Sequence, residues 1–365
     1  MLTHRQFAER VIIAMAIVGL ALLIWQLRAL LILVFGAVMF AVILRIIANP
    51  LKRRFGLSDG VALLLAILFV FALFAAAGLL FGAEVARQAK DLTETLPKAW
   101  QLFQQRLDSW GVAEPVKQWT ESLRNSAGGS GIVSNLSGIL SRVGGAITDT
   151  VLVVVGGIFL AIDPNLYRQG LGKLMPESAR DNLRQAFDDC WTALRLWLLA
   201  RLATMAMVGV ITGIGLWAIG VPAALTLGIL AGFLDFIPFV GPIIAAIPAV
   251  LLSLAADPSK AIWVAALYLL VQQIEGNVIT PIFQKRAVEL PPALLLFSLV
   301  ACGLVFGIAG VLFAEPLTVV LYVMVKRLYV REALQTPTPI PGENQGPPTP
   351  PPPPEGRSVR VKAID

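Results

Sequence analysis

A short polar segment near the end of an apolar run holds the residues best suited to chemistry. Residues 272–281 read Gln-Gln-Ile-Glu-Gly-Asn-Val-Ile-Thr-Pro and close the apolar run 261–280. On a helix at 100° per residue, the polar and small side chains gather on or beside one third of the surface. They are Gln272, Gln273, Glu275, Gly276, Asn277 and Thr280, with Pro281 directly after them.

Glu275 is the one acid of this segment. A charged side chain at the centre of a bilayer costs roughly 2.5–3.5 kcal/mol on insertion scales, so it should face protein or water and find partners. We therefore predict that this segment lines a substrate or ion pathway. An alternative is that Gln and Asn only bind neighbouring helices, while Glu275 lies near the membrane interface.

A second candidate is a predicted break in the apolar stretch 223–256. It contains Asp235, Pro238, Gly241 and Pro242, and the two prolines are four residues apart. Proline removes a backbone hydrogen bond and clashes with the preceding turn of a helix. Broken helices at membrane depth occur where protein or water satisfies the freed groups, and many transporters build their sites from them. These four residues are therefore predicted to line the pathway, unless they form a loop at the membrane surface.

A third candidate lies in the apolar stretch 293–325. Gly307 and Gly310 permit close approach of helices, and Glu315 precedes Pro316, which is expected to break the helix. We add Gly307, Gly310 and Glu315 to the predicted pathway. The stretches at 222 and 292 both begin with Pro-Ala and a following leucine, which hints at a structural repeat of the kind found in alternating-access transporters.

The elements that must position these residues are membrane helices. Hydrophobic residues make up 57% of the 365, charged residues only 14%, and the mean hydropathy is +0.78. A soluble domain carries about 25% charged residues, and about 20 apolar residues in a row suffice to cross a bilayer. The predicted fold is an all-α, polytopic membrane protein with about eight transmembrane segments, including broken or re-entrant helices.

Several other functions are disfavoured by the sequence. The net charge is +6, but the basic residues lie beside apolar runs rather than among aromatic residues, which argues against nucleic-acid binding. The only histidine is His4, Cys190 and Cys302 have no metal or disulfide spacing, and no phosphate-binding G-x-x-x-x-G-K-[ST] loop occurs. We predict that the protein is not an enzyme and has no cofactor and no metal site.

The chain divides into four predicted regions. They are an N-terminal hairpin with a third span in 1–83, an extracytoplasmic amphipathic segment in 84–145, a transport core in 146–334 with a cytoplasmic loop at 164–190, and a disordered proline-rich tail in 335–365. Eight crossings, together with the basic turn at Lys52 to Arg54, place both termini in the cytoplasm. In this scheme Arg201 stands at the cytoplasmic entrance of a span over 202–221.

Several short strings resemble the hallmark of the autoinducer-2 exporter family of permeases. They are Gly220 to Leu225, Ile237-Pro238 with Gly241-Pro242, Gln273 to Asn277 with Pro281, Leu290 to Pro292, and Gly307 to Gly310 with Pro316. Their order and spacing agree with that family from about residue 7 to residue 331. The resemblance implies a bacterial inner-membrane protein that forms homo-oligomers. It also implies a family in which some members export a furanone-type signal and others look like cation/proton antiporters.

Three functions remain open on the sequence alone. The first is a permease that exports a small solute or signalling molecule, driven by an ion gradient. The second is a Na⁺(Li⁺)/H⁺ antiporter that uses Glu275, with Asp235 or Glu315. The third is a membrane scaffold that binds partners through 84–145, and no transport would then be measurable.

Overall fold

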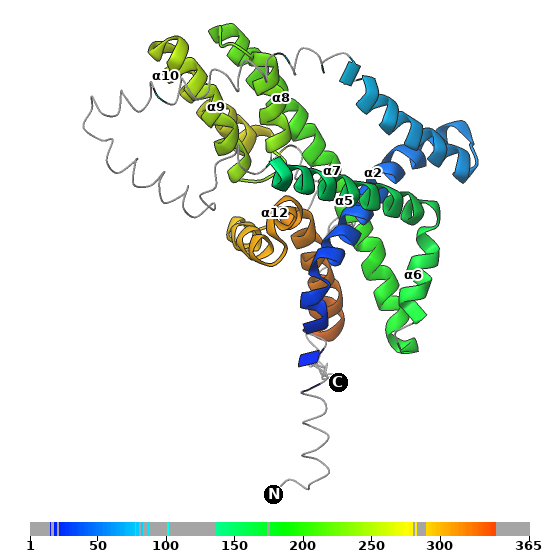
Figure 1. Ribbon diagram of the computed structural model, residues 1–365. Coiled ribbons are helices and arrows are strands. Elements are labelled where there is room, and N and C mark those ends of the chain that lie inside the picture. The colour runs from blue at the N-terminus through cyan, green and yellow to red at the C-terminus, as the bar shows by residue number, and fades with distance from the viewer. Residues whose placement is uncertain are drawn as a thin grey trace, which may run out of the picture.

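The computed structural model describes residues 22–76, 136–173, 176–279 and 290–340, and a few single residues outside those ranges. The described part contains helices and no strand (Figure 1). Its helices are α2 (Arg28–Phe55), a helix over Asp59–Ala76, α5 (Leu136–Ile162), α6 (Pro164–Lys173), α7 (Glu177–Ile219), α8 (Ala224–Leu234), α9 (Val240–Ala256), α10 (Pro258–Ile274), the π-helix η1 (Glu275–Ile279), α12 (Pro292–Met324) and the π-helix η2 (Val325–Ala333). Most of 84–145, the tail from 341 and Pro281 lie outside the described residues.

Five of these helices are long and apolar enough to cross a membrane. They lie within Arg28–Phe55, Asp59–Ala76, Ala179–Ile219, Ser259–Ile279 and Pro292–Ala333. A sixth span results if Thr148–Ile162 and Pro164–Gly170, which are bent by 87° at their junction, count as one. The prediction of an all-α polytopic membrane protein is confirmed.

Helix α2 ends where its sequence requires. Gly56 adopts a left-handed conformation with φ +64°, directly after the basic last turn Lys52 to Arg54. Glycine and basic residues both favour the end of a helix, the first by its backbone freedom and the second by its charge. Arg45 of α2 also donates from Nε to the carbonyl oxygen of Ala161, 2.8 Å away, and so satisfies a free carbonyl at the end of α5.

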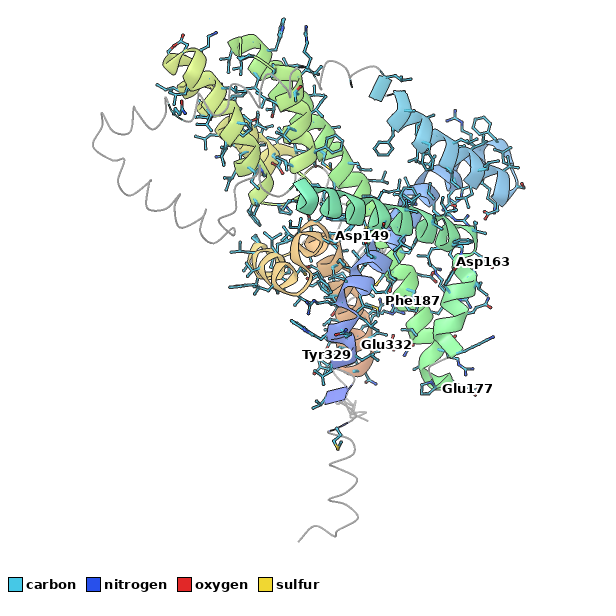
Figure 2. All side chains as sticks on the ribbon, viewed as in Figure 1. Asp149, Asp163, Glu177, Phe187, Tyr329 and Glu332 are labelled. Atoms are coloured by element: carbon cyan, nitrogen blue, oxygen red, sulfur yellow. The ribbon has the colours of Figure 1, made fainter. Side chains whose placement is uncertain are left out.

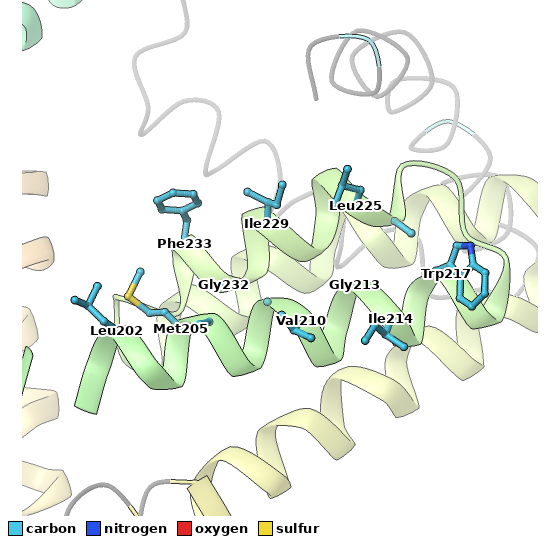
Figure 3. A pocket seen from close by; sticks show the side chains of 13 residues that line it. Leu202, Met205, Val210, Gly213, Ile214, Trp217, Leu225, Ile229, Gly232 and Phe233 are labelled. Atoms are coloured by element: carbon cyan, nitrogen blue, oxygen red, sulfur yellow. The ribbon is translucent and has the colours of Figure 1, made fainter. Parts of the chain in front are cut away.

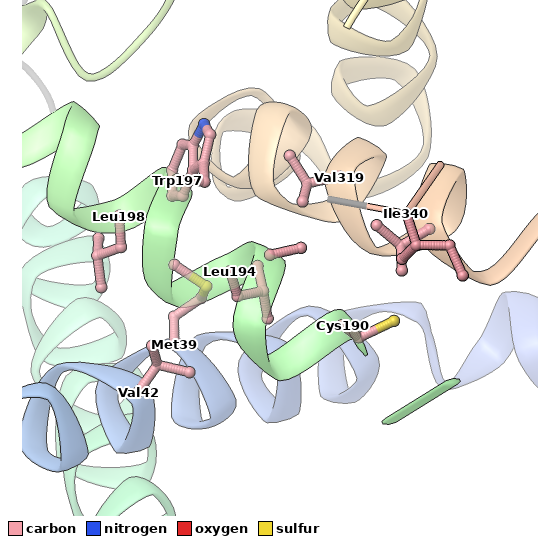
Figure 4. Packing of buried hydrophobic residues seen from close by; sticks show 10 residues of the cluster. Met39, Val42, Cys190, Leu194, Trp197, Leu198, Val319 and Ile340 are labelled. Atoms are coloured by element: carbon pink, nitrogen blue, oxygen red, sulfur yellow. The ribbon is translucent and has the colours of Figure 1, made fainter. Parts of the chain in front are cut away.

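The 43-residue helix α7 is the central element of the bundle. Such a helix is about 64 Å long at 1.5 Å per residue, roughly twice the thickness of the hydrocarbon layer. Figure 4 shows Leu194 and Trp197 of α7 packing near Met39 of α2 and Val319 of α12. The first part of the predicted loop 164–190 is α6, and its last part is the beginning of α7.

Helices α7 and α8 approach each other closely through four glycines. A Cβ atom on Gly228 would lie 2.6 Å from the Cα atom of Gly213, and one on Gly232 would lie 2.8 Å from the carbonyl oxygen of Met205. The spacing of Gly209 with Gly213, and of Gly228 with Gly232, is the small-xxx-small pattern that brings membrane helices together. The α7–α8 pair therefore depends on residues without side chains.

Both long apolar stretches are broken, as the sequence predicts. The first divides into α8 and α9 around Asp235 to Phe239, and Phe239 has φ +63°. A Cβ on Gly241 would lie 1.8 Å from the carbonyl oxygen of Leu234, so only glycine fits at this turn. Pro242 lies in the first turn of α9, where its missing N–H has no helical acceptor.

The second stretch folds back at Gly307, which has φ +67° and ψ −146°. A Cβ on Gly310 would lie 2.0 Å from the carbonyl oxygen of Cys302, and one on Gly303 would lie 3.0 Å from Val311, so the two arms of α12 pack against each other. The expected break at Pro316 is wrong, because this proline lies inside the second arm. A proline removes one backbone bond, and packed neighbours allow a membrane helix to continue past it.

Candidate functional site

The centre of the candidate site is a single arginine on the long helix α7. Arg201 has 24 helical residues before it and 18 after it, and its side chain is only 12% exposed. Its guanidinium nitrogens lie 4.0 Å from Asp235 Oδ2, 3.8 Å from Glu275 Oε1 and 3.9 Å from Glu315 Oε2. We call these four residues the charge cluster.

The three acids reach Arg201 from three different elements. Asp235 caps the C-terminal end of α8, where the chain turns toward α9. Glu275 is the first residue of the π-helix η1, a form that is often found at functional sites. Glu315 lies on the second arm of α12. The cluster therefore joins α7 to both broken stretches and to the end of the α10 span.

The polar atoms of the cluster are poorly satisfied. Both carboxylate oxygens of Asp235, Oε2 of Glu315 and Nε of Arg201 are buried, and none has a hydrogen-bond partner among the described residues. Glu275 accepts one hydrogen bond, from Nε2 of Gln272 at 3.1 Å. Buried polar atoms without partners cost about 1–3 kcal/mol each, so the cluster favours the binding of a further group.

The charges of the cluster do not balance. Three carboxylates face one guanidinium, which leaves two excess negative charges if all four groups are ionised. A buried uncompensated charge is strongly unfavourable, and a group in such a place tends to neutralise. The arrangement can therefore take up protons, a small cation or a polar solute with donor groups.

Trp197 carries a second buried polar group on the same helix as Arg201. Trp197 lies one helical turn before Arg201 on α7, and its ring meets that of Phe236 edge to face, with centroids 5.9 Å apart. Phe236 directly follows Asp235 in the chain. The indole N–H is buried and has no partner within the described part of the chain, so it is a free donor one helical turn from Arg201.

The sequence-predicted residues separate into two groups in the structure. Asp235, Glu275 and Glu315 meet at Arg201, and Gln272 bonds to Glu275. Gln273, Asn277 and Gly307 are exposed, and the side-chain amide of Asn277 donates to the carbonyl oxygen of Gln273 at 3.0 Å. The remaining predicted residues lie at the two breaks and are not members of the charge cluster. They are Pro238, Gly241, Pro242 and Gly310.

The prediction that a span begins at residue 202 stays a prediction, because α7 is long enough to extend beyond the hydrocarbon layer. What the sequence reasoning missed is the role of Arg201, which lies inside α7 and faces three acids. One signal in the sequence could have identified it. Between Arg195 and Lys260, Arg201 is the only basic residue, and it interrupts an apolar run, where a cation needs an acidic partner.

A groove of about 660 Å³ runs along α7 and α8 (Figure 3), and Leu202 at its edge directly follows Arg201 in the chain. Leu202, Met205 and Val210 of α7 line it together with Ile229 and Phe233 of α8. Its lining contains no titratable side chain. Its apolar walls can hold hydrocarbon, but the groups that can carry charge are at Arg201.

The comparison with known families identifies the class of protein. The sequence profile described as AI-2E family transporter matches residues 12–329. The chain belongs to the AI-2E family of transporters. This family member is therefore a multi-pass bacterial membrane protein with a role in transport, and the resemblance described from its motifs is confirmed.

Several relatives of this AI-2E family member have names that refer to transport. YueF of Bacillus subtilis (strain 168), named as a candidate transport protein, is 27% identical over 319 residues, which cover 81% of this chain and 83% of YueF. YrrI of the same organism, named in the same way, is 27% identical over 248 residues, 65% of this chain and 69% of YrrI. TqsA of Escherichia coli (strain K12), named as an AI-2 transport protein, is 24% identical over 299 residues, 79% of this chain and 84% of TqsA.

Proposed function

We propose that the chain exports a small solute or signalling molecule across the bacterial inner membrane, and that protons moving through the charge cluster drive this export. The observation that carries the proposal is the position of Arg201 within 4.0 Å of three buried carboxylates. A buried group of ionisable residues in a membrane protein is by default a site for ions, protons or substrate. Membership of a transporter family supports the same function.

The cluster offers a physical route from proton binding to movement. Arg201 is attracted at once to the α8–α9 break, to η1 and to the second arm of α12. A proton on one carboxylate removes the charge from that pair and weakens the attraction at that element, while the other two pairs remain. Protonation would then free one broken helix relative to α7, which is how a small local change can alternate access to a central site.

Two further parts of the proposal concern placement and assembly. The basic turn Lys52 to Arg54 lies at the same end as α6, and the positive-inside rule assigns that end to the cytoplasm. We call this end of the bundle the basic end. From this assignment of the basic end to the cytoplasm, we place both termini in the cytoplasm, the segment 84–145 outside and the proline-rich tail 335–365 inside.

Following the family resemblance, we also propose that the chain works as a homo-oligomer.

Autoinducer-2 is the first probe to use for the substrate. TqsA is named as an AI-2 transport protein, and its alignment covers 79% of this chain. We therefore propose a small, polar, uncharged molecule of this kind as cargo. The unpartnered indole N–H of Trp197 and the carboxylates of the charge cluster can both hydrogen-bond to such a molecule.

The test is flux in liposomes that contain the purified protein. Autoinducer-2 should leave the vesicles faster when a proton gradient is imposed, and Glu275→Gln should reduce this gradient-driven flux at least about tenfold, since one titrating carboxylate of the cluster is lost. The matched control is Glu177→Gln, which changes an exposed acid at the start of α7, the helix that carries Arg201, and should leave the flux unchanged. Flux in Glu275→Gln equal to that of the unchanged protein would remove Glu275 from the mechanism.

A Na⁺(Li⁺)/H⁺ antiporter is the second candidate, because the two excess negative charges of the cluster also suit a small cation. The same vesicles distinguish the two functions. Addition of Na⁺ or Li⁺ without autoinducer-2 should release protons from vesicles if the chain is an antiporter. If it is an exporter driven by protons, the salt should cause no proton release.

A further inference from the structure

A polar groove at the basic end carries a net positive charge that has no part in the transport proposal. Two adjoining grooves of about 390 and 410 Å³ lie between α6, the first part of α7 and the end of α2, and they share Asn165, Arg168 and Asp188 in their walls. Figure 2 labels Asp163, which directly precedes α6, and Phe187 of α7, which lines the second groove. We refer to the two together as the α6–α7 groove.

The α6–α7 groove is basic. Six basic side chains line it: Arg45, Lys52, Arg168, Lys173, Arg180 and Arg184. Three acidic side chains line it: Asp59, Asp181 and Asp188. The difference of six and three leaves three positive charges in the groove, which attract an anion.

Most of these basic groups already have a partner. Arg45 and Lys52 both donate to Asp59, and Arg168 is paired with Asp188. Lys173 and Arg184 are exposed, and neither contacts a carboxylate among the residues that the structure describes. Two cations in one groove are therefore available to bind an anion from outside the chain.

The groove begins at the bend between α5 and α6. Helix α5 ends at Ile162, the chain bends by 87°, and the groove lining starts at Pro164 and Asn165. Leu166 and Tyr167 on the first turns of α6 are exposed apolar side chains, and tyrosine is enriched at the level of the lipid headgroups. A phospholipid, which carries an anionic phosphate next to hydrocarbon, matches a basic groove with exposed apolar side chains beside it.

We propose that the α6–α7 groove binds the headgroup of an anionic phospholipid, with Lys173 and Arg184 holding its phosphate. Basic pockets at the cytoplasmic side of membrane helices recognise anionic lipids in this way. The acyl chains would lie against the apolar residues around the junction of α5 and α6. The bound lipid would hold α6 beside α7 at the bend.

The test uses the full-length protein purified in a neutral detergent. Phosphatidylglycerol should raise the thermal unfolding midpoint in a saturable manner, whereas phosphatidylcholine should not. In the double variant Lys173→Gln/Arg184→Gln, half of the rise should require about tenfold more phosphatidylglycerol, because two charges near the phosphate are lost. The control Arg53→Gln/Arg54→Gln removes two exposed charges that do not line the groove and should bind like the unchanged protein.

Three results would overturn the proposal. The first is an equal loss in the control variant, which would mean that only general charge attraction is measured. The second is an equal rise with the same concentration of inorganic phosphate, which would identify a site for soluble anions. The third is the absence of a saturable rise. If the double variant does not fold by circular dichroism and gel filtration, the single variants Lys173→Gln and Arg184→Gln are measured instead, each with a smaller expected shift in the same direction.

Discussion

At the scale of residues, Arg201 determines which acids can act together. An isolated guanidinium inside hydrocarbon is unfavourable, and so is an isolated carboxylate. Asp235, Glu275 and Glu315 each remove part of this cost for Arg201, and Arg201 does the same for each of them. Ion pairs of this kind behave as a unit, so the loss of one member leaves the others uncompensated.

The first prediction concerns the loss of the cation. Arg201→Gln leaves three buried acids without a positive partner and should lower the stability by about 3 kcal/mol, measured as a fall in the thermal unfolding midpoint. The control Arg195→Gln removes an exposed arginine six residues earlier on α7, which has no carboxylate contact within the described residues, and should change the midpoint little.

The second prediction follows from coupling within the cluster. The double variant Arg201→Gln/Glu275→Gln also lacks one of the excess carboxylates. Its loss of stability should therefore be smaller than the sum of the losses in the two single variants. Thermal unfolding is measured for the unchanged protein, the two single variants and the double variant, which together form a double-mutant cycle. Additive effects would mean that Arg201 and Glu275 do not interact, despite their distance of 3.8 Å.

The sequence identified the three acids but not what joins them. Asp235, Glu275 and Glu315 stand out because each interrupts an apolar stretch, which is a local signal. Their common contact with Arg201 depends on how α7 packs against both broken stretches, over separations of 34 to 114 residues. The polar side of residues 272–280 was a weaker guide, since Gln273 and Asn277 are exposed.

At the scale of elements, both sharp turns depend on a glycine, and Pro238 is the one proline of the two broken stretches that lies in a turn, between α8 and α9. Pro242, Pro248 and Pro316 all lie inside helices. The fold-back of α12 is at Gly307, and the α8–α9 turn needs the space at Gly241. The sequence could predict that both stretches break, but not which residue carries the turn, because the packing of the two arms selects it.

The third prediction tests the turn at Gly307. Its φ of +67° with ψ of −146° lies in a region that residues with a Cβ rarely adopt, so Gly307→Ala should cost about 1–3 kcal/mol. Gly276→Ala is the control, because Gly276 has no positive φ and a Cβ there would meet no atom within 4 Å. The thermal midpoint should fall for Gly307→Ala alone, and similar midpoints in both variants would contradict the account of this turn.

The fourth prediction tests the contact between α7 and α8. In Gly228→Ala the new methyl group would lie 2.6 Å from the Cα of Gly213, and backbone cannot move aside as a side chain can, so we expect a loss of about 1–3 kcal/mol. A Cβ on Gly60 would meet nothing within 4 Å, which makes Gly60→Ala the matched control. An unchanged unfolding midpoint in Gly228→Ala would show that the two helices can separate freely.

At the scale of the whole molecule, two broken stretches meet on one long helix. Ile237 and Val240 at the first break pack against the cluster of Leu299, Cys302 and Ala314 in the second stretch. The similar starts of these stretches in the sequence therefore correspond to two similar elements, each a helix, a turn and a second helix. Composition and hydropathy sufficed to predict membrane residence, whereas this arrangement needed the structure.

The fifth prediction concerns orientation. Single cysteines would be introduced after replacement of the two buried ones, Cys190 and Cys302. Glu177→Cys at the basic end should react with a membrane-impermeant maleimide only after the cells are permeabilised. Pro222→Cys, beyond the other end of α7, should react in spheroplasts that are intact. The reverse pattern would invert the proposed topology and the direction of transport that depends on it.

The central claim is that the charge cluster binds and releases protons, and infrared spectroscopy of the purified protein at different pH values tests it most directly. The account predicts a carboxylic-acid C=O band that disappears as the pH is raised, and that Glu275→Gln removes or shifts while Glu177→Gln leaves it in place. The absence of a pH-dependent band, or a band that stays unchanged in each of Glu275→Gln, Asp235→Asn and Glu315→Gln, would contradict it.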